Sequence, residues 1–173
     1  MPFIKVYNLT FAGKLDLSYK PVFVSRQTHE KDLARSIVRS GDILINIVGP
    51  PLGQVSIVPS TTSEANINQA IARFRAIYPD TRDFISICLM TQKVIGWAVT
   101  RAKTTAGQSN LTLELCRDLP IPLPPLAEQA RIVAEVERQL SVVEELETVV
   151  TVNQNRANSL RQSILKNAFH GAL

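Results

Sequence analysis

The chain has 173 residues, of which 45% are hydrophobic and 20% charged. This balance is that of a globular protein and not of a disordered or membrane one, and the length fits one folded domain with an appendage. The formal net charge of +4 is uneven, because residues 1–120 hold fourteen Lys/Arg against nine Asp/Glu and residues 121–173 hold five against six. We therefore expect the front part of the chain to meet any polyanionic partner.

The two cysteines indicate a reducing compartment. Cys88 and Cys116 lie in apolar stretches and are interpreted as small buried side chains. Residues 1–5 lack the layout of a signal peptide, and no apolar run approaches the roughly eighteen residues needed to span a bilayer. We expect a cytoplasmic protein without a membrane partner.

The first hundred residues predict short strands and turns with one or two helices. Residues 3–7 alternate as a strand does, and a turn at Gly13 separates them from an extended segment at 15–19. Residues 28–39 are expected to form an amphipathic helix capped by Thr28.

The clearest strand is residues 42–48, a β-branched run bounded by glycines, with residues 54–58 as its partner across a turn. Residues 66–75 fit either a strand or one helical turn, and the pattern leaves this open. Residues 82–92 predict a helix. Residues 111–115 alternate leucine with polar residues, which predicts a half-buried strand.

A proline-rich connector at residues 119–125 divides the chain. The following residues 126–169 contain no proline or glycine and predict one helix of about 44 residues, roughly 66 Å long. An apolar heptad seam runs along it, interrupted by Gln139 and Asn153. The seam residues are Ile132, Val136, Val143, Leu146, Val150, Ala157, Leu160 and Ile164.

No second helix of matching length exists in the chain to cover this seam. A long core helix of a larger domain is the alternative interpretation, and an intermolecular coiled coil that makes a homodimer is preferred. The expected fold class is therefore an α/β (α+β) domain over residues 1–123, with a twisted sheet and short helices, followed by one long C-terminal helix over residues 124–173.

Residues 119–133 resemble the motif IPLPPLxEQxxIV, which opens the spacer helix in specificity subunits of type I restriction-modification systems. Residues 163–173 are similar to the family's helix end, ILxxAFxGxL, and residues 41–45 are similar to the GDIL strand of its target-recognition domain. A complete subunit has two recognition domains and two spacer helices, whereas one of each is present here. The resemblance also begins part way into the recognition domain.

The resemblance implies a non-catalytic, DNA-reading half-subunit. In the family, the recognition domain reads one half of a bipartite target, and the helices pair antiparallel and dock methyltransferase subunits, which link to the restriction subunit. A single half is then expected to homodimerise, and an isologous contact closes at two chains. The alternative is a protein-interaction and dimerisation module that reads no DNA sequence.

Double-stranded DNA requires cations for phosphates and amide, hydroxyl or guanidinium groups for base edges. The polar segment from Arg101 to Asn110 offers both kinds, although a solvated surface loop is the alternative interpretation. Two weaker groups of cations come from residues 26–35 and 73–75. The DNA-binding candidates are Arg101, Lys103, Thr104, Thr105, Gln108, Ser109, Asn110, Arg26, Lys31, Arg35, Arg73 and Arg75.

Catalytic and metal-binding signatures are not found in the sequence. Gly49-Pro50-Pro51-Leu52 has the prolines of a base-methylating tetrad without its asparagine or aromatic residue. Histidine and cysteine spacing does not suggest zinc. We expect no catalytic residue, no metal site and no cofactor.

Overall fold

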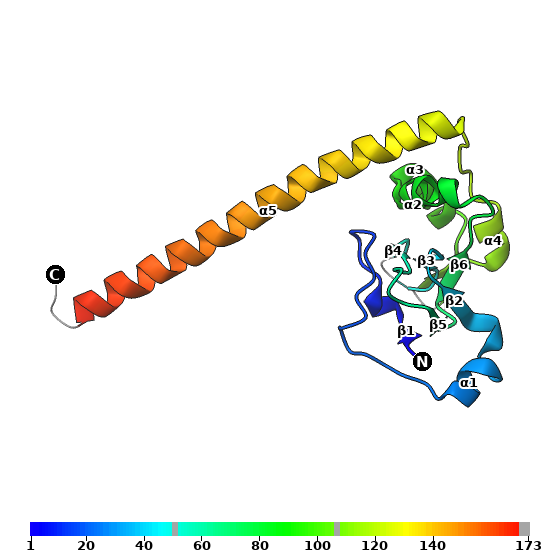
Figure 1. Ribbon diagram of the computed structural model, residues 1–173, viewed down its shortest axis with the longest axis horizontal. Helices are drawn as coiled ribbons and strands as arrows, with labels where there is room; N and C mark the ends of the chain where they lie inside the picture. Colours follow the sequence, from blue (N-terminus) through cyan, green and yellow to red (C-terminus); the bar gives the residue numbers. More distant parts are fainter. Residues whose placement is uncertain (50–51, 106–107, 170–173) are drawn as a thin grey trace. The chain divides into compact units, whose positions relative to one another are not determined.

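In the computed structural model, the described residues are 1–49, 52–105 and 108–169, with only the backbone described for residues 103–105 and 108. The chain divides into two compact units, Met1–Ala130 and Arg131–Leu173. The first unit contains all the strands in Figure 1, and the second consists of most of the long helix α5.

Two small sheets form the framework of the first unit. The first sheet has the order β1-β5-β2, with β1 (Phe3–Ile4) parallel and β2 (Ile37–Arg39) antiparallel to β5 (Glu64–Ile67). The second has the order β4-β3-β6, in which β4 (Val55–Ile57) and β6 (Ile71–Phe74) both run antiparallel to β3 (Ile43–Asn46).

Strand β3 is buried on both faces, and its two faces belong to different cores. Ile43 and Ile45 point into a core with α2 (Arg82–Met90), α3 (Gln92–Val99) and α4 (Leu113–Arg117). Leu44, between them, packs into a second core with residues of the first sheet. The alternation of side chains along a strand explains this division. It also explains why three consecutive residues, Ile43, Leu44 and Ile45, are apolar.

The predicted strand at 42–48 and its partner at 54–58 are confirmed, because Ile43 pairs with Ile57 and Ile45 with Val55. The segment 66–75 contributes the end of β5 and the whole of β6, joined by a turn in which the Ile71 amide donates to the Asn68 carbonyl at 3.1 Å. Its two halves therefore belong to different sheets.

The predicted helix at 28–39 is wrong beyond its first turn. Helix α1 (Arg26–Glu30) is capped by Ser25, whose Oγ accepts from the Thr28 amide at 3.0 Å, so Thr28 lies inside the helix and not at its cap. The 3-10 helix η2 (Ala34–Ser36) and strand β2 follow. Pairing with β5 buries Val38 completely, and this tertiary contact outweighs the helical spacing.

The predicted strand at 111–115 is also wrong. Helix α4 begins there, capped by Thr112, whose Oγ1 accepts from the Leu115 amide at 3.2 Å. Leu113 is exposed, whereas Cys116 is buried. The side chains therefore follow a helical period and not an alternating one.

Three further segments differ in detail. The strand expected at 3–7 is limited to β1, and η1 (Val6–Asn8) follows it as a 3-10 helix. Residues 15–19 make only an isolated bridge, between Leu15 and Leu9. The helix expected at 82–92 is confirmed as α2, but Thr91 ends it and caps α3, which was not predicted.

Helix α5 (Leu126–Phe169) is one uninterrupted helix (Figure 1). Its first turn is held to the first unit through Gln129, a buried side chain whose Nε2 donates to the Pro124 carbonyl at 2.8 Å. Among the described residues, no helix is both long enough and apolar enough to cross a bilayer.

Gly53 occupies a turn where no larger residue fits. Its φ is +80°, and a Cβ there would lie 2.7 Å from Cδ1 of Ile95 on α3. Gly13 has a similar φ of +76°, but a Cβ there meets only Met90 Cε, at an ordinary 3.5 Å.

Both Gly13→Ala and Gly53→Ala are expected to lower the free energy of unfolding by about 1–2 kcal/mol through the left-handed backbone. Gly53→Ala should cost about 1–3 kcal/mol more, because it overpacks the core beside Ile95. Urea denaturation of the two variants measures the difference, and equal losses would contradict the close approach of α3.

The carboxylate of Asp42 is buried at the start of β3 and is held by Arg75. Arg75 Nε and Nη2 donate to its two oxygens at 2.6 and 2.7 Å, and the Arg39 amide donates at 2.8 Å. The Asp42 side chain is 2% exposed and that of Arg75 49%. This carboxylate raises the pKa of Arg75 through its hydrogen bonds.

Arg75→Ala is expected to destabilise the fold by about 1–3 kcal/mol, because it leaves a buried carboxylate without its charged partner. Arg26→Ala is the matched control: the ion pair of Arg26 with Glu30 is exposed to solvent, so its loss should have a much smaller effect on stability. Urea denaturation compares the two. Equal effects would show that the Asp42 pair is energetically a surface pair.

Candidate nucleic-acid interface

The polar segment predicted to meet DNA forms a hairpin attached to the end of β3. Strands β7 (Lys103–Thr105) and β8 (Gln108–Asn110) pair antiparallel. The Ser109 carbonyl accepts from the Gly49 amide at 3.0 Å, and the Leu111 amide donates to the Ile47 carbonyl at 2.9 Å. The base of the hairpin is thus fixed to the core sheet. Residues 106 and 107, which separate the two strands in the sequence, lie outside the described residues.

Arg101 lies just before this hairpin, where its guanidinium stacks on Trp97. The Arg101 Cζ lies 4.3 Å from the ring centroid, and Nη1 donates to the Trp97 carbonyl and to Thr100 Oγ1, both at 3.2 Å. Stacking orients the guanidinium while the side chain stays exposed. An exposed, oriented cation beside a polar hairpin suits contact with a phosphate.

The cations of the first predicted cluster are separated by the fold. Arg26 pairs with Glu30 at 2.7 Å on the exposed surface of α1, and Lys31 is exposed at the end of that helix. Arg35 follows on η2 and lines a groove with residues of other elements.

His29 of the same segment is buried and has a structural role. Its Nδ1 lies 2.7 Å from Asn66 Oδ1, and Asn66 Nδ2 donates to the Leu33 carbonyl at 3.0 Å, which orients that amide. Its Nε2 lies 3.3 Å from Glu64. Hydrogen bonds from Arg39 first, and then from His29, lower the pKa of Glu64. This network joins α1 to β5.

The two arginines at 73 and 75 have different surroundings. Arg75 is committed to Asp42, as described above. Arg73 is exposed on β6, where its Nη1 donates to the Ile37 carbonyl of β2 and its side chain lines the groove that Arg35 also lines.

This groove, of about 690 Å³, lies where the two sheets and α4 meet. Ile47, Ile67, Ile71, Ala72 and Cys116 are its buried apolar lining. Its other lining residues, with larger or polar side chains, are Phe3, Leu33, Arg35, Ser36, Asn68, Gln69, Arg73, Phe74, Leu113 and Arg117.

Arg117 on α4 is the groove residue that sequence reasoning missed. It is exposed. Burial raises the pKa of the neighbouring Cys116 thiol, and the positive charge of Arg117 acts in the opposite direction with a smaller effect. It was missed because residues 111–115 were predicted to form a strand. Only a helix that starts at Leu113 brings this arginine to the groove that Arg35 and Arg73 also line.

Asn68 occupies the turn between β5 and β6 in this groove. Its Oδ1 is buried and has no hydrogen-bond partner among the described residues. An unpartnered buried polar group costs about 1–3 kcal/mol. The turn therefore carries an unsatisfied acceptor beside the exposed Gln69.

The predicted seam of α5 is solvent-exposed over most of its length within the single chain. Val143, Leu146, Val150, Leu160 and Ile164 are each about half exposed, at 48–64%. Isolated apolar side chains on a surface are ordinary, but a continuous stripe of them marks an interaction surface.

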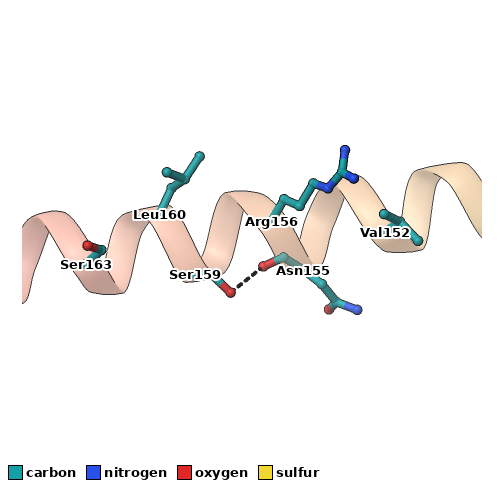
Figure 2. Close-up of a pocket in the computed structure, with 6 residues that line it drawn as sticks. All are labelled: Val152, Asn155, Arg156, Ser159, Leu160 and Ser163. Atoms are coloured by element: carbon teal, nitrogen blue, oxygen red, sulfur yellow. Dashed lines mark hydrogen bonds between the residues drawn. The ribbon is translucent and has the colours of Figure 1, made fainter.

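Figure 2 shows a shallow strip on this helix, lined by Val152, Asn155, Arg156, Ser159, Leu160 and Ser163. These residues recur at helical spacing along one face, and Ser159 Oγ donates to the Asn155 carbonyl at 3.0 Å. All of them come from one helix, so the strip has a single wall. It is a helix face open to a partner and not a ligand pocket.

Among residues 1–49, 52–105 and 108–169, no three His, Cys, Asp or Glu side chains are grouped so that they could hold a metal ion.

Comparison with known proteins assigns the family. Residues 8–149 match the family described as "Type I restriction modification DNA specificity domain". The specificity subunit of the type I restriction enzyme EcoBI from Escherichia coli is 34% identical over 167 residues, covering 93% of this chain and 33% of that protein. The EcoKI specificity subunit from Escherichia coli strain K12 is 28% identical over 155 residues, covering 83% of this chain and 32% of that protein.

Solved structures show the same fold. The HsdS subunit from Thermoanaerobacter tengcongensis matches with a TM-score of 0.64 and 22% identity, over 84% of this chain and 37% of that one. A chain from a structure that concerns complex assembly and conformational transition of the type I R-M system matches with a TM-score of 0.71 and 24% identity. The match covers 96% of this chain and 42% of that one.

This chain spans about a third of the length of the curated relatives that it matches. The family match covers strands β2 to β8, helices α1 to α4 and the first half of α5. The chain therefore belongs to the type I restriction modification DNA specificity domain family.

Proposed function

We propose that this chain is the DNA sequence-recognition component of a type I restriction-modification system and binds one half of a bipartite target. The observation that carries the proposal is the family match over a domain whose exposed arginines and polar hairpin suit phosphates and base edges. The hairpin residues from Lys103 to Asn110, with Arg101 before them, are proposed as the base-reading side.

We further propose that two chains pair through α5 as an antiparallel coiled coil. The exposed seam supports pairing, and the charge along the helix supports the direction. Residues 126–147 contain six Glu and two Arg, whereas residues 148–169 contain Arg156, Arg161 and Lys166 and no acid. Antiparallel pairing sets the acidic half of one helix beside the basic half of the other, and parallel pairing opposes like charges.

The chain is proposed to be non-catalytic and to dock the methyltransferase subunit, through which it reaches the restriction subunit. The names of its relatives, which are specificity subunits of restriction enzymes, support this role. A paired α5 would leave the helix faces outside the seam free for such docking.

Leu146→Glu with Val150→Glu is expected to convert the dimer to a monomer, because it places four carboxylates at the middle of the seam. Ser141→Glu with Thr148→Glu adds the same charge to the opposite side of the heptad and should leave the dimer intact. Sedimentation equilibrium measures the mass. A monomeric parent protein, or equal behaviour of the two variants, would overturn the proposed interface.

Selection from a random duplex pool is expected to enrich a two-part sequence with two-fold symmetry. Binding should weaken steeply with salt, with a slope of about −0.9 per phosphate contacted. The monomeric Leu146→Glu/Val150→Glu variant should enrich only one half of that sequence, more weakly.

Dimers that bind the cognate methyltransferase subunit without enriching any sequence would instead identify an interaction module that reads no DNA. An enriched sequence without symmetry would contradict the symmetric pairing but not DNA recognition.

A further inference from the structure

Three arginines from distant parts of the chain converge on the groove between the two sheets and α4. Arg35 comes from η2, Arg73 from β6 and Arg117 from α4. All three are exposed. Only the packing of these elements brings them to one groove.

The convergence is not balanced by acids. None of the described lining residues of the groove is Asp or Glu. Within the described part of the chain, the side chains of Arg35 and Arg117 make no hydrogen bond or ion pair with another residue, and the side chain of Arg73 donates only to the Ile37 carbonyl. Positive charges gathered without counter-charges create a positive electrostatic potential, which favours the binding of an anion. Arg26, Arg39, Arg75 and Arg82, by contrast, each pair with a carboxylate.

The shape of the groove indicates what kind of anion it takes. Its volume of about 690 Å³ greatly exceeds the space needed by one phosphate ion. Beneath the arginines, its lining is apolar, with Ile67, Ile71 and Cys116 buried. A nucleic-acid strand presents this combination, because it has phosphates at regular intervals joined by sugars with apolar edges.

We propose that this groove is a phosphate-binding site that seats one strand of the target DNA through Arg35, Arg73 and Arg117. The proposal rests on the proposed function and divides the domain's work: the groove fixes the position of the duplex, and the hairpin β7–β8 reads its bases. Contacts to phosphate set affinity and register, whereas contacts to base edges set sequence preference.

The test compares Arg35→Ala, Arg117→Ala and the double variant with Arg82→Ala, which removes the same charge from outside the groove, where Arg82 pairs with Asp83. Each is titrated with the duplex that the parent protein selects and with a scrambled duplex, over a range of salt concentrations. Each groove variant should weaken binding to both duplexes by roughly three- to tenfold and reduce the salt slope by about one per arginine removed. Arg82→Ala should leave both quantities near those of the parent.

Selection with the Arg117→Ala protein should return the parent's sequence. A changed sequence would mean that the groove reads bases, and it would overturn the assignment to phosphates. Groove variants that behave like Arg82→Ala would overturn the site while leaving DNA recognition intact. A folded parent protein that binds neither duplex would overturn the proposed function and the groove together.

Discussion

The fold of the first unit depends on one strand that is buried from both sides. Ile43 and Ile45 of β3 belong to the core under α2, α3 and α4, and Leu44 belongs to the core shared with the first sheet. Burying such side chains contributes about 1.5–3 kcal/mol each. A polar substitution at Ile43 or Ile45 would therefore disturb the core under the helices, and one at Leu44 would disturb the core shared with the first sheet. The Asp42–Arg75 ion pair lies at the start of this strand, where the Asp42 carboxylate is buried.

The proposed DNA-contacting parts are arranged around that strand. The chain continues from β3 through residues 47–49, to which the base of the hairpin is hydrogen-bonded, and Ile47 itself lines the arginine groove. The groove's Arg73 lies on β6, where it pairs in register with Leu44 of β3. A rigid strand thus supports both surfaces, and polar side chains held on rigid backbone lose less entropy when they bind.

The second unit follows a different physical rule. A single long helix cannot cover its own apolar stripe, and its Glu-rich first half and basic second half complement each other only in another copy or in a partner. Its backbone hydrogen bonds are satisfied within the helix, so the helical backbone does not itself require a partner. Pairing would then supply the tertiary contacts from which most helices gain their stability.

How far the sequence predicts the structure differs between these parts for a physical reason. Features set by local chemistry could be read directly: the proline connector, the uninterrupted helix from Leu126 to Phe169, the strand at 42–48 with its partner, and the helix at 82–92. Residues 28–39 and 111–115 could not be read in this way. Val38 gains more from pairing with β5 than from a helical turn, and the Thr112 cap starts a helix where alternation suggested a strand.

The candidate site shows the same division. The polar hairpin and the cations Arg35 and Arg73 are visible as residue types in the sequence, whereas Arg117 could be placed with them only when α4 was seen as a helix. The sequence by itself determined the long helix, its seam and the family resemblance, because these depend on spacing along the chain. Tertiary structure alone decided that Arg75 pairs with the buried Asp42. It also decided that Arg35, Arg73 and Arg117 line one groove without acidic residues, because pairing between charges depends on distance in space.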